Sequence, residues 1–287
     1  MIAFRLAAGK KVYALQSATV PLVYLDQWAY MSFAKDQRKL ERFADEIVRS
    51  DATLAFSILN YYELSRISDL NQLSRIEDLL GQIWPRLVFV NSDPTAVIER
   101  EDDPQSGMSN QAPHLDDWML SKFADRYRAG MNPRNPKGFL LQLRNPRIAD
   151  GLRDAYCKLV RGVIAAVEKS RDMYQRDGTA RIEVCSRPKG KPVPHPTRYI
   201  FEQAVYSIVK GNFNTRNANE VADFLHMVVP LSYCDVVLLD KSWAARAHQA
   251  QNAVKNGGLL TYEAAIFSPK TVEEFWVKFG RHCPSRT

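Results

Sequence analysis

Acidic residues follow two apolar runs of this sequence at the point where each run ends. The run PLVYL is followed by Asp26, and the run VVLL is followed by Asp240. Glu63 follows a third run, ATLAFSIL, and Asp223 lies in the segment that precedes VVLL. Because ligands of open parallel sheets bind outside the carboxyl ends of the strands, we expect these four carboxylates to converge on one edge of a sheet.

Four converging carboxylates indicate a divalent cation. Like charges at close range repel one another unless an opposite charge neutralises them. A set of oxygen ligands, without a suitable group of histidines or cysteines, favours Mg²⁺ or Mn²⁺. Such a metal activates water and stabilises the charge on a transferring phosphoryl group. The residues therefore predict phosphodiester hydrolysis, and they leave open whether one or two metal ions are bound.

The same acids, in this order and setting, resemble the metal site of PIN-domain nucleases. The matching segments are VYLD, NYYELSRI, NANEVADFLH and VVLLDK. The stretch DFLHMVVPLSYCDVVLLD is similar to a bacterial PIN-like subgroup with the pattern D-x-x-H, then Y-C-D, then a strand that ends in Asp. The segment AAIFSPKTVEEFW resembles the final PIN strand and helix. The resemblance covers roughly residues 21–100 and 217–280, and it does not cover the middle of the chain.

This resemblance implies a fold, an activity and a site. The implied fold is α/β, a PIN-like three-layer α/β/α arrangement with a central parallel sheet and a helical insertion. The implied activity is metal-dependent endoribonuclease cleavage of RNA. The residues implied as metal ligands and catalytic groups are Asp26, Glu63, Asp223 and Asp240. Many PIN domains continue the first acid as Asp-Thr-Asn or Asp-Ser-Asn, whereas this chain has Gln27 and Trp28; Gln27 could supply an amide instead.

Each acid also has a structural interpretation. Asp26 and Asp240 could each only cap the helix that follows, a role that Asp fills well. Glu63 could form a surface ion pair with Arg66, three residues further on, and such a pair would contribute little stability. Asp223 could be an ordinary surface residue of its helix. The ordered set of four acids favours the metal site over these separate roles.

Two further polar residues lie in the same stretch of sequence. Asp235 and Asp240 flank a four-residue strand, so at about 3.3 Å per residue they lie roughly 16 Å apart and cannot share a metal ion. Asp235 is therefore expected to cap or bond the turn that enters the strand. His226 lies one helical turn after Asp223 on the same face. It could position a phosphate or a water beyond the metal's own ligands, or it could be purely structural.

Basic residues are concentrated in the middle of the chain. Residues 121–210 hold 19 Lys and Arg against 8 Asp and Glu, in a chain with a net charge of +7. Such a segment suggests a nucleic-acid partner, and the PIN resemblance favours RNA over DNA. The expected substrate-binding residues are Arg187, Lys189, Lys191 and Arg198. Nearby aromatic residues could stack on bases, although an ordinary solvated surface is the alternative.

Strand-like and helix-like segments alternate at both ends of the chain, the pattern of a parallel sheet with helices on both faces. Strands are predicted over 21–26, 52–59, 86–90, 236–239 and 264–268. Helices are predicted over 34–49, 114–129, 148–176, 217–228 and 241–256, and the helix over 217–228 is expected to end before a turn at Pro230. Three further helices are predicted to begin with Asn60 as a cap, at Pro94 and at Thr197. The predicted organisation is a PIN-like core in two parts, 18–100 and 216–287, interrupted by a basic helical insertion at 101–215.

Composition limits the class of protein. The 287 residues are 46% hydrophobic, enough to bury a substantial core. The cysteines lie far apart without a C-x-x-C pair, which argues against a disulfide framework or a zinc site. No stretch approaches the roughly 20 apolar residues of a membrane span, and the N-terminal apolar run is too short for a secretory signal. We therefore expect a cytoplasmic protein without a membrane partner.

Several alternatives remain open from the sequence alone. The enzyme could act on DNA, or it could be a phosphatase of a similar fold. The chain could also be a PIN-like scaffold that binds nucleic acid or protein through a degenerate site. A homo-oligomer and an inhibitory protein partner are both compatible with the sequence.

Overall fold

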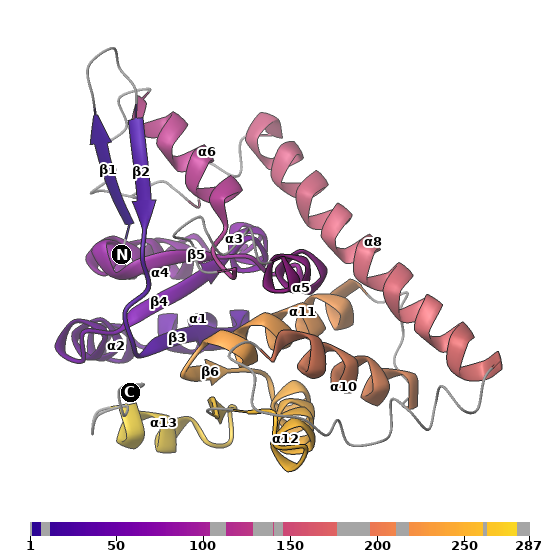
Figure 1. Ribbon diagram of the computed structural model, residues 1–287. Coiled ribbons are helices and arrows are strands. Elements are labelled where there is room, and N and C mark those ends of the chain that lie inside the picture. Colours follow the sequence, from indigo (N-terminus) through magenta and orange to yellow (C-terminus); the bar gives the residue numbers. More distant parts are fainter. Residues whose placement is uncertain are drawn as a thin grey trace.

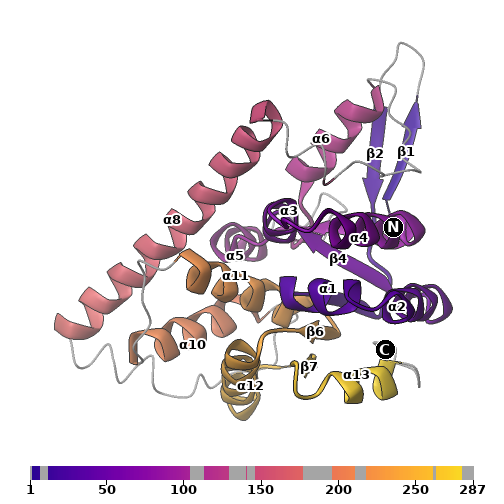
Figure 2. The ribbon, with the colours of Figure 1, turned by 180° about the vertical axis from the view of Figure 1, so that it is seen from behind.

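The computed structural model of the chain is shown from opposite sides in Figures 1 and 2. The residues it describes are 2–6, 12–103, 113–128, 140, 146–176, 196–210, 218–260 and 263–279.

Within this described part, five parallel strands form one sheet in the order β5-β4-β3-β6-β7. The strands are β3 (Leu22–Leu25), β4 (Thr53–Ser57), β5 (Leu87–Val90), β6 (Val236–Leu238) and β7 (Ala265–Phe267). Nearly all of their residues are buried, as expected for a parallel sheet covered on both faces. The five predicted strands are confirmed, and so is the α/β class with a parallel sheet flanked by helices.

The strand order reverses at the middle of the sheet. From β3 the chain moves outward through β4 to β5, and the later strands β6 and β7 extend the sheet on the other side of β3. Tyr24 on β3 is paired with both Ala55 and Val237. The crevice at such a reversal point is the usual binding position of open α/β sheets. Asp26 and Asp240 follow the two strands that border it.

Two groups of helices accompany the sheet, an arrangement compatible with three α/β/α layers. The first group is α1 (Gln27–Ala34), α2 (Gln37–Arg49), α3 (Ile58–Ser65) and α4 (Leu70–Gln82), which pack against one another. The second group is α5 (Pro94–Asp102), α10 (Thr197–Lys210), α11 (Ala218–Tyr233) and α12 (Lys241–Asn256). The C-terminal helix α13 (Val272–Phe279) packs the rings of Phe275 and Phe279 against Phe43 of α2.

Capping residues set where helices begin, and the structure corrects two of the predictions made for helices: the cap of α3 and the role of Pro230. Asp93 caps α5 and Pro94 occupies its first turn, as predicted. Asn60 is not the cap of α3: Ser57 is, and Asn60 completes a capping box from the third position of the helix. Pro230 lies inside α11 rather than in a turn. Its neighbours Val229 and Leu231 are buried, so packing outweighs the local preference of proline.

The middle of the chain contributes α6 (Asp117–Arg128), α8 (Pro146–Arg176) and α10, which confirms the predicted helices there. Helix α6 packs on β5 and on the N-terminal strand β2 (Val12–Gln16). Helix α8 crosses the outside of α3 and α11 (Figures 1 and 2) and buries a stripe that includes Leu152, Tyr156 and Val160. These helices share the main hydrophobic core. The boundaries of the proposed insertion stay a prediction.

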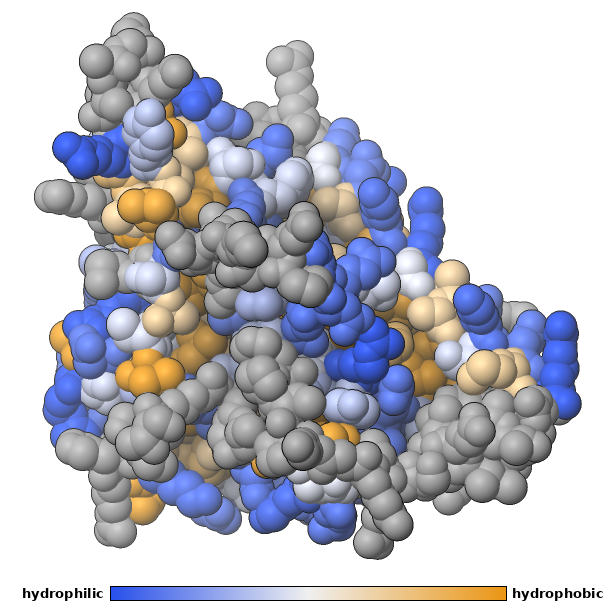
Figure 3. All heavy atoms as spheres, viewed as in Figure 1, coloured by the Kyte–Doolittle hydropathy of each residue, from blue (hydrophilic) through white to orange (hydrophobic). Residues whose placement is uncertain are grey.

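An N-terminal hairpin was not foreseen. Strands β1 (Ile2–Leu6) and β2 (Val12–Gln16) pair antiparallel. Gln16 binds the hairpin to the body, because its Oε1 accepts from the Phe89 amide at 3.0 Å and its Nε2 donates to the Asp116 carbonyl at 3.3 Å. Tyr13 and Leu15 point outward and are 56% and 70% exposed. Figure 3 shows hydrophobic side chains near the hairpin and many hydrophilic ones along the side of α8.

No helix in the described ranges combines the length and the apolar character needed to cross a membrane. Among the described residues, Cys157 and Cys234 take part in no disulfide. The other two cysteines, Cys185 and Cys283, lie outside the described residues.

Candidate metal centre

Asp26 and Asp240 meet where β3 and β6 end. The Asp26 amide donates to the Leu238 carbonyl at 3.0 Å, which extends the pairing of the two strands by one bond. The Asp240 amide then donates to Asp26 Oδ2 at 3.2 Å. Asp26 is buried, with 4% of its surface exposed, and Asp240 is half-buried. The adjacent parallel strands therefore bring the two aspartates together, as the sequence predicted.

Both aspartates also cap helices. Asp26 is the N-cap of α1, and its Oδ1 accepts from the Gln27 amide. Asp240 is the N-cap of α12, and its Oδ1 accepts from the amides of Ser242 at 2.6 Å and Trp243 at 3.1 Å. An ionised carboxylate has about four acceptor positions on its two oxygens. Capping and metal binding are therefore compatible, and the two interpretations of each residue do not compete.

Asp223 joins these two residues from helix α11. Oxygen atoms of Asp26, Asp223 and Asp240 all lie within 4.8 Å of one another. The donors are all carboxylate oxygens, which suit the hard cations Mg²⁺ and Mn²⁺. Such a close group of acids fits a divalent cation in charge as well as in ligand type.

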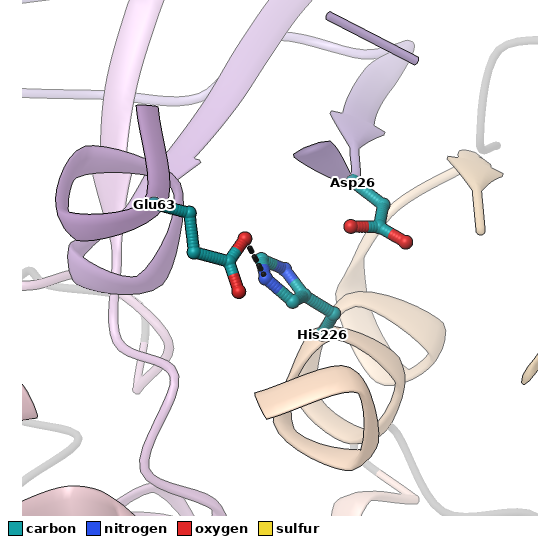
Figure 4. Close-up of side chains that lie close together, drawn as sticks. All are labelled: Asp26, Glu63 and His226. Carbon is teal, nitrogen blue, oxygen red and sulfur yellow. Dashed lines mark hydrogen bonds and ion pairs between the residues drawn. The ribbon is translucent and has the colours of Figure 1, made fainter. Parts of the chain in front are cut away.

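Glu63 and His226 form the other side of the centre. Figure 4 shows Glu63 on α3 and His226 on α11 pointing toward each other, with the carboxylate of Asp26 beside the imidazole ring. Ligand atoms of Asp26, Glu63 and His226 also lie within 4.8 Å of one another. Asp26 thus belongs to both groups and links Glu63 to the pair of Asp223 and Asp240.

His226 is the partner of Glu63. Its ring Nε2 lies 2.9 Å from Glu63 Oε2, and the histidine is completely buried. The alternative in which Glu63 pairs with Arg66 is therefore incorrect. The Arg66 guanidinium lies instead over the Tyr62 ring, 5.4 Å from its centroid. The buried histidine approaches the carboxylate more closely than the exposed arginine because α11 packs against α3.

Burial and mutual repulsion disturb the ionisation of the acids. Burial raises the pKa of Asp26 to about 6, with His226 acting against this shift and Glu63 adding to it. Burial and the nearby Asp26 carboxylate raise the pKa of Asp223 to about 7. For His226, burial acts to lower the pKa, but Glu63 and Asp26 outweigh it and raise the pKa to about 9. The centre therefore favours added positive charge, from protons or from a metal ion.

The other residues named in the sequence analysis are not ligand candidates of the centre, and each has a different place in the structure. Gln27 donates from Nε2 to the backbone carbonyl of Glu63 at 3.4 Å, so it links α1 to α3 through the main chain. Asp235 accepts from the Leu22 amide at 2.6 Å, at the opposite ends of the strands from the carboxylates, as predicted. Arg198, on α10, forms an ion pair with Asp102. Arg187, Lys189 and Lys191 lie outside the described residues.

Three polar residues beneath the centre were not predicted as part of the site. Tyr24, Ser57 and Asn60 are completely or almost completely buried. The Tyr24 hydroxyl lies 2.5 Å from His226 Nδ1 and 3.1 Å from Ser57 Oγ. One signal was available, because Tyr24 lies two residues before Asp26 and alternate residues of a strand share a face.

Comparisons of the chain with protein-family models, with curated proteins and with solved structures find no match.

Proposed function

We propose that the protein is a PIN-like nuclease that hydrolyses phosphodiester bonds of RNA with Mg²⁺ or Mn²⁺. The observation that carries this proposal is the convergence of Asp26, Asp223 and Asp240, whose oxygen atoms lie within 4.8 Å of one another. They converge at the reversal point of a parallel sheet, where ligands of such sheets usually bind. Glu63 is the fourth carboxylate of the centre, and it lies close to Asp26. A bound Mg²⁺ or Mn²⁺ supplies activation of water and neutralises charge on the phosphoryl group.

The protein's own groups hold this arrangement in place. The backbone bonds between β3 and β6 fix Asp26 and Asp240 relative to each other. Their helices α1 and α12 both begin at the centre, and the N-termini of helices carry partial positive charge that favours a phosphate nearby. His226 binds Glu63 and compensates part of the negative charge.

The proposed polyanionic substrate is supported by the position of α8. This helix packs against α3 and α11, the helices that carry Glu63 and Asp223. Its exposed basic side chains include Arg153, Lys158 and Lys169. Such charges attract a phosphate backbone without reading its sequence. The preference for RNA over DNA, and the assignment to the PIN-like nucleases, rest on the sequence resemblance.

The test is cleavage of end-labelled RNA and DNA of the same sequence in Mg²⁺, in Mn²⁺ and in EDTA. We expect cleavage of RNA only with metal. Asp26→Asn and Asp240→Asn should each lower the rate by about two orders of magnitude or more, the scale seen when transition-state stabilisation is removed. Asp235→Asn is the matched control, because it lies at the other end of β6 and Asn can still accept from the Leu22 amide.

Cleavage that persists in EDTA, or full activity in both site variants, would contradict the proposal. Cleavage of DNA alone would establish the DNA-directed alternative. Release of phosphate from monoesters without strand cleavage would establish a phosphatase. Binding of RNA without any cleavage would establish a scaffold.

A further inference from the structure

A chain of buried hydrogen bonds extends from Glu63 into the core. Beyond His226 it passes through the Tyr24 hydroxyl and Ser57 Oγ to the amide of Asn60. It connects α11, β3, β4 and α3 beneath the carboxylates, and its inner members are shielded from water. Each contact in the chain occupies a polar atom, and the contacts of the two ring nitrogens decide what His226 can do.

The hydrogen bonds at the inner end, where side chain meets backbone, have a fixed direction. The Ser57 amide can only donate, and it lies 2.9 Å from Asn60 Oδ1. The Leu25 carbonyl can only accept, and it lies 2.8 Å from Asn60 Nδ2. The two backbone groups therefore determine the orientation of the Asn60 amide without ambiguity.

From this end the contacts continue toward the histidine. Asn60 Oδ1 cannot donate, so Ser57 Oγ is the donor in their 3.1 Å hydrogen bond. Ser57 Oγ also accepts from the Asn60 backbone amide at 3.4 Å, and it lies 3.1 Å from the Tyr24 hydroxyl. The same hydroxyl lies 2.5 Å from His226 Nδ1. This ring nitrogen is therefore engaged by a buried group of the core in either tautomer of the ring.

The other ring nitrogen faces a carboxylate. His226 Nε2 lies 2.9 Å from Glu63 Oε2. An unprotonated Nε2 would point its lone pair at carboxylate oxygen, whereas an N–H donates to it in a strong charge-assisted bond. Both ring nitrogens of the buried His226 are thus engaged by protein groups, Nδ1 by Tyr24 and Nε2 by Glu63, and neither is available to a metal ion.

We propose that Tyr24 and His226 are positioning residues that hold Glu63, and that His226 is not itself a metal ligand. This inference rests on the proposed metal centre and makes it more specific. It leaves a ligand set of carboxylate oxygens, although His226 lies within ligand distance of Asp26 and Glu63. Such a set selects Mg²⁺ or Mn²⁺ over the metals that prefer imidazole. Tyr24 acts from the core, two hydrogen bonds away from Glu63.

The sharpest variant pair removes one hydroxyl from each of two buried tyrosines. Tyr24→Phe breaks the chain beside His226. Tyr30→Phe is the matched control, because Tyr30 is also completely buried and its hydroxyl has no hydrogen-bond partner in the described part of the chain. We expect Tyr24→Phe to weaken Mn²⁺ binding by about 10- to 100-fold, the usual effect of losing a group that orients a ligand, and Tyr30→Phe to leave it unchanged. Equal affinities in the two variants would overturn the proposal.

Two measurements on the unmodified protein test the same point without relying on the variants. Pulsed EPR of bound Mn²⁺ should show no coupling to a directly coordinated imidazole nitrogen, and such coupling would overturn the proposal. Long-range ¹H–¹⁵N spectra of the metal-free protein should show a proton on His226 Nε2, the nitrogen that faces Glu63. An Nε2 without a proton would overturn the proposal as well.

These readouts separate the two proposals. If the protein binds no Mn²⁺, the metal centre itself is wrong, and Glu63 then has no ligand role for which it could be positioned. If Mn²⁺ binds with imidazole coordination, the metal centre stands and the positioning role of His226 fails.

Discussion

At the scale of single residues, Asp26 combines structural and chemical roles. It ends β3, caps α1 and accepts from the Asp240 amide. These bonds hold a buried carboxylate in place while its pKa stays raised to about 6, chiefly by burial. A carboxyl whose charged form is disfavoured in this way gains from a nearby cation.

The raised pKa values predict that protons compete with the metal. Asp26 and Asp223, with pKa values near 6 and 7, are protonated at low pH, and a metal can bind only after these protons leave. We expect the Mn²⁺ affinity to increase as the pH rises from 5 to about 7.5 and then to level off. Calorimetry in two buffers of different ionisation enthalpy should detect proton release on binding within this range.

The control for this prediction is Asp223→Asn. The variant should bind Mn²⁺ more weakly. Its Mn²⁺ affinity should no longer change with pH near 7, because the Asp223 carboxyl that releases a proton there is absent. An affinity that is constant between about pH 5 and 8 would contradict the assignment of these carboxyls as ligands.

At the scale of elements, the centre depends on helices that begin where strands end. Helix α12 starts at Asp240, and α1 starts at Asp26, so two helix N-termini are fixed by the residues that would bind the metal. Helices α3 and α11 contribute Glu63 and His226 from the sides. The structural and chemical roles of one residue can therefore be separated by the choice of substitution.

Asp240 allows this separation. Asn and Asp are about equally good helix caps, whereas Ala at this position costs about 1 kcal/mol of stability. We expect Asp240→Asn to retain the free energy of unfolding and Asp240→Ala to lose about 1 kcal/mol, as measured by urea unfolding. Both variants should lose cleavage of RNA to a similar degree. A loss of stability in the Asn variant equal to that of Ala would show that the charge, rather than the cap, stabilises the fold.

At this scale the sequence was a good guide to strands and a weaker guide to caps. Each core strand is a short apolar run closed by a polar residue, so its position is visible locally. Ser57 and Asn60 are both good capping residues, and only the end of β4 decides that Ser57 is the cap. The hairpin of β1 and β2 escaped prediction because an isolated hairpin is marginal, and this one is held by packing against α6 and by the bonds of Gln16.

At the scale of the whole molecule, the charge is distributed unevenly. Residues 121–210 contain 19 of the 39 Lys and Arg residues. Helix α8, from this segment, lies along the helices that carry Glu63 and Asp223 (Figure 1). A long polyanion bound at the carboxylates would therefore pass close to basic side chains.

The segment's basic residues should contribute to affinity rather than to catalysis. Replacing Arg187, Lys189 and Lys191 together by Ala should weaken RNA binding and lower the slope of log affinity against log salt by about 2, since each phosphate contact adds about 0.7 for single strands. Filter binding over a range of salt concentrations measures this slope. Mn²⁺ affinity should be unchanged.

Three basic residues on α2 and before it, Lys35, Arg38 and Lys39, provide a control of equal charge outside the segment. Their replacement by Ala should leave the slope closer to that of the unmodified protein. If the two triple variants behave alike, binding depends on net charge alone, and the segment has no special role.

The parallel α/β sheet and the positions of Asp26 and Asp240 follow from local sequence, because a buried strand and the acid that ends it are adjacent in the chain. The contacts of Glu63 with His226 and of His226 with Tyr24 arise only when the chain is folded. Those contacts depend on the register of β3 against β6 and on how α11 packs against α3. Tyr24 and His226 are about 200 positions apart in the chain, and a local sequence pattern cannot predict a contact over that separation.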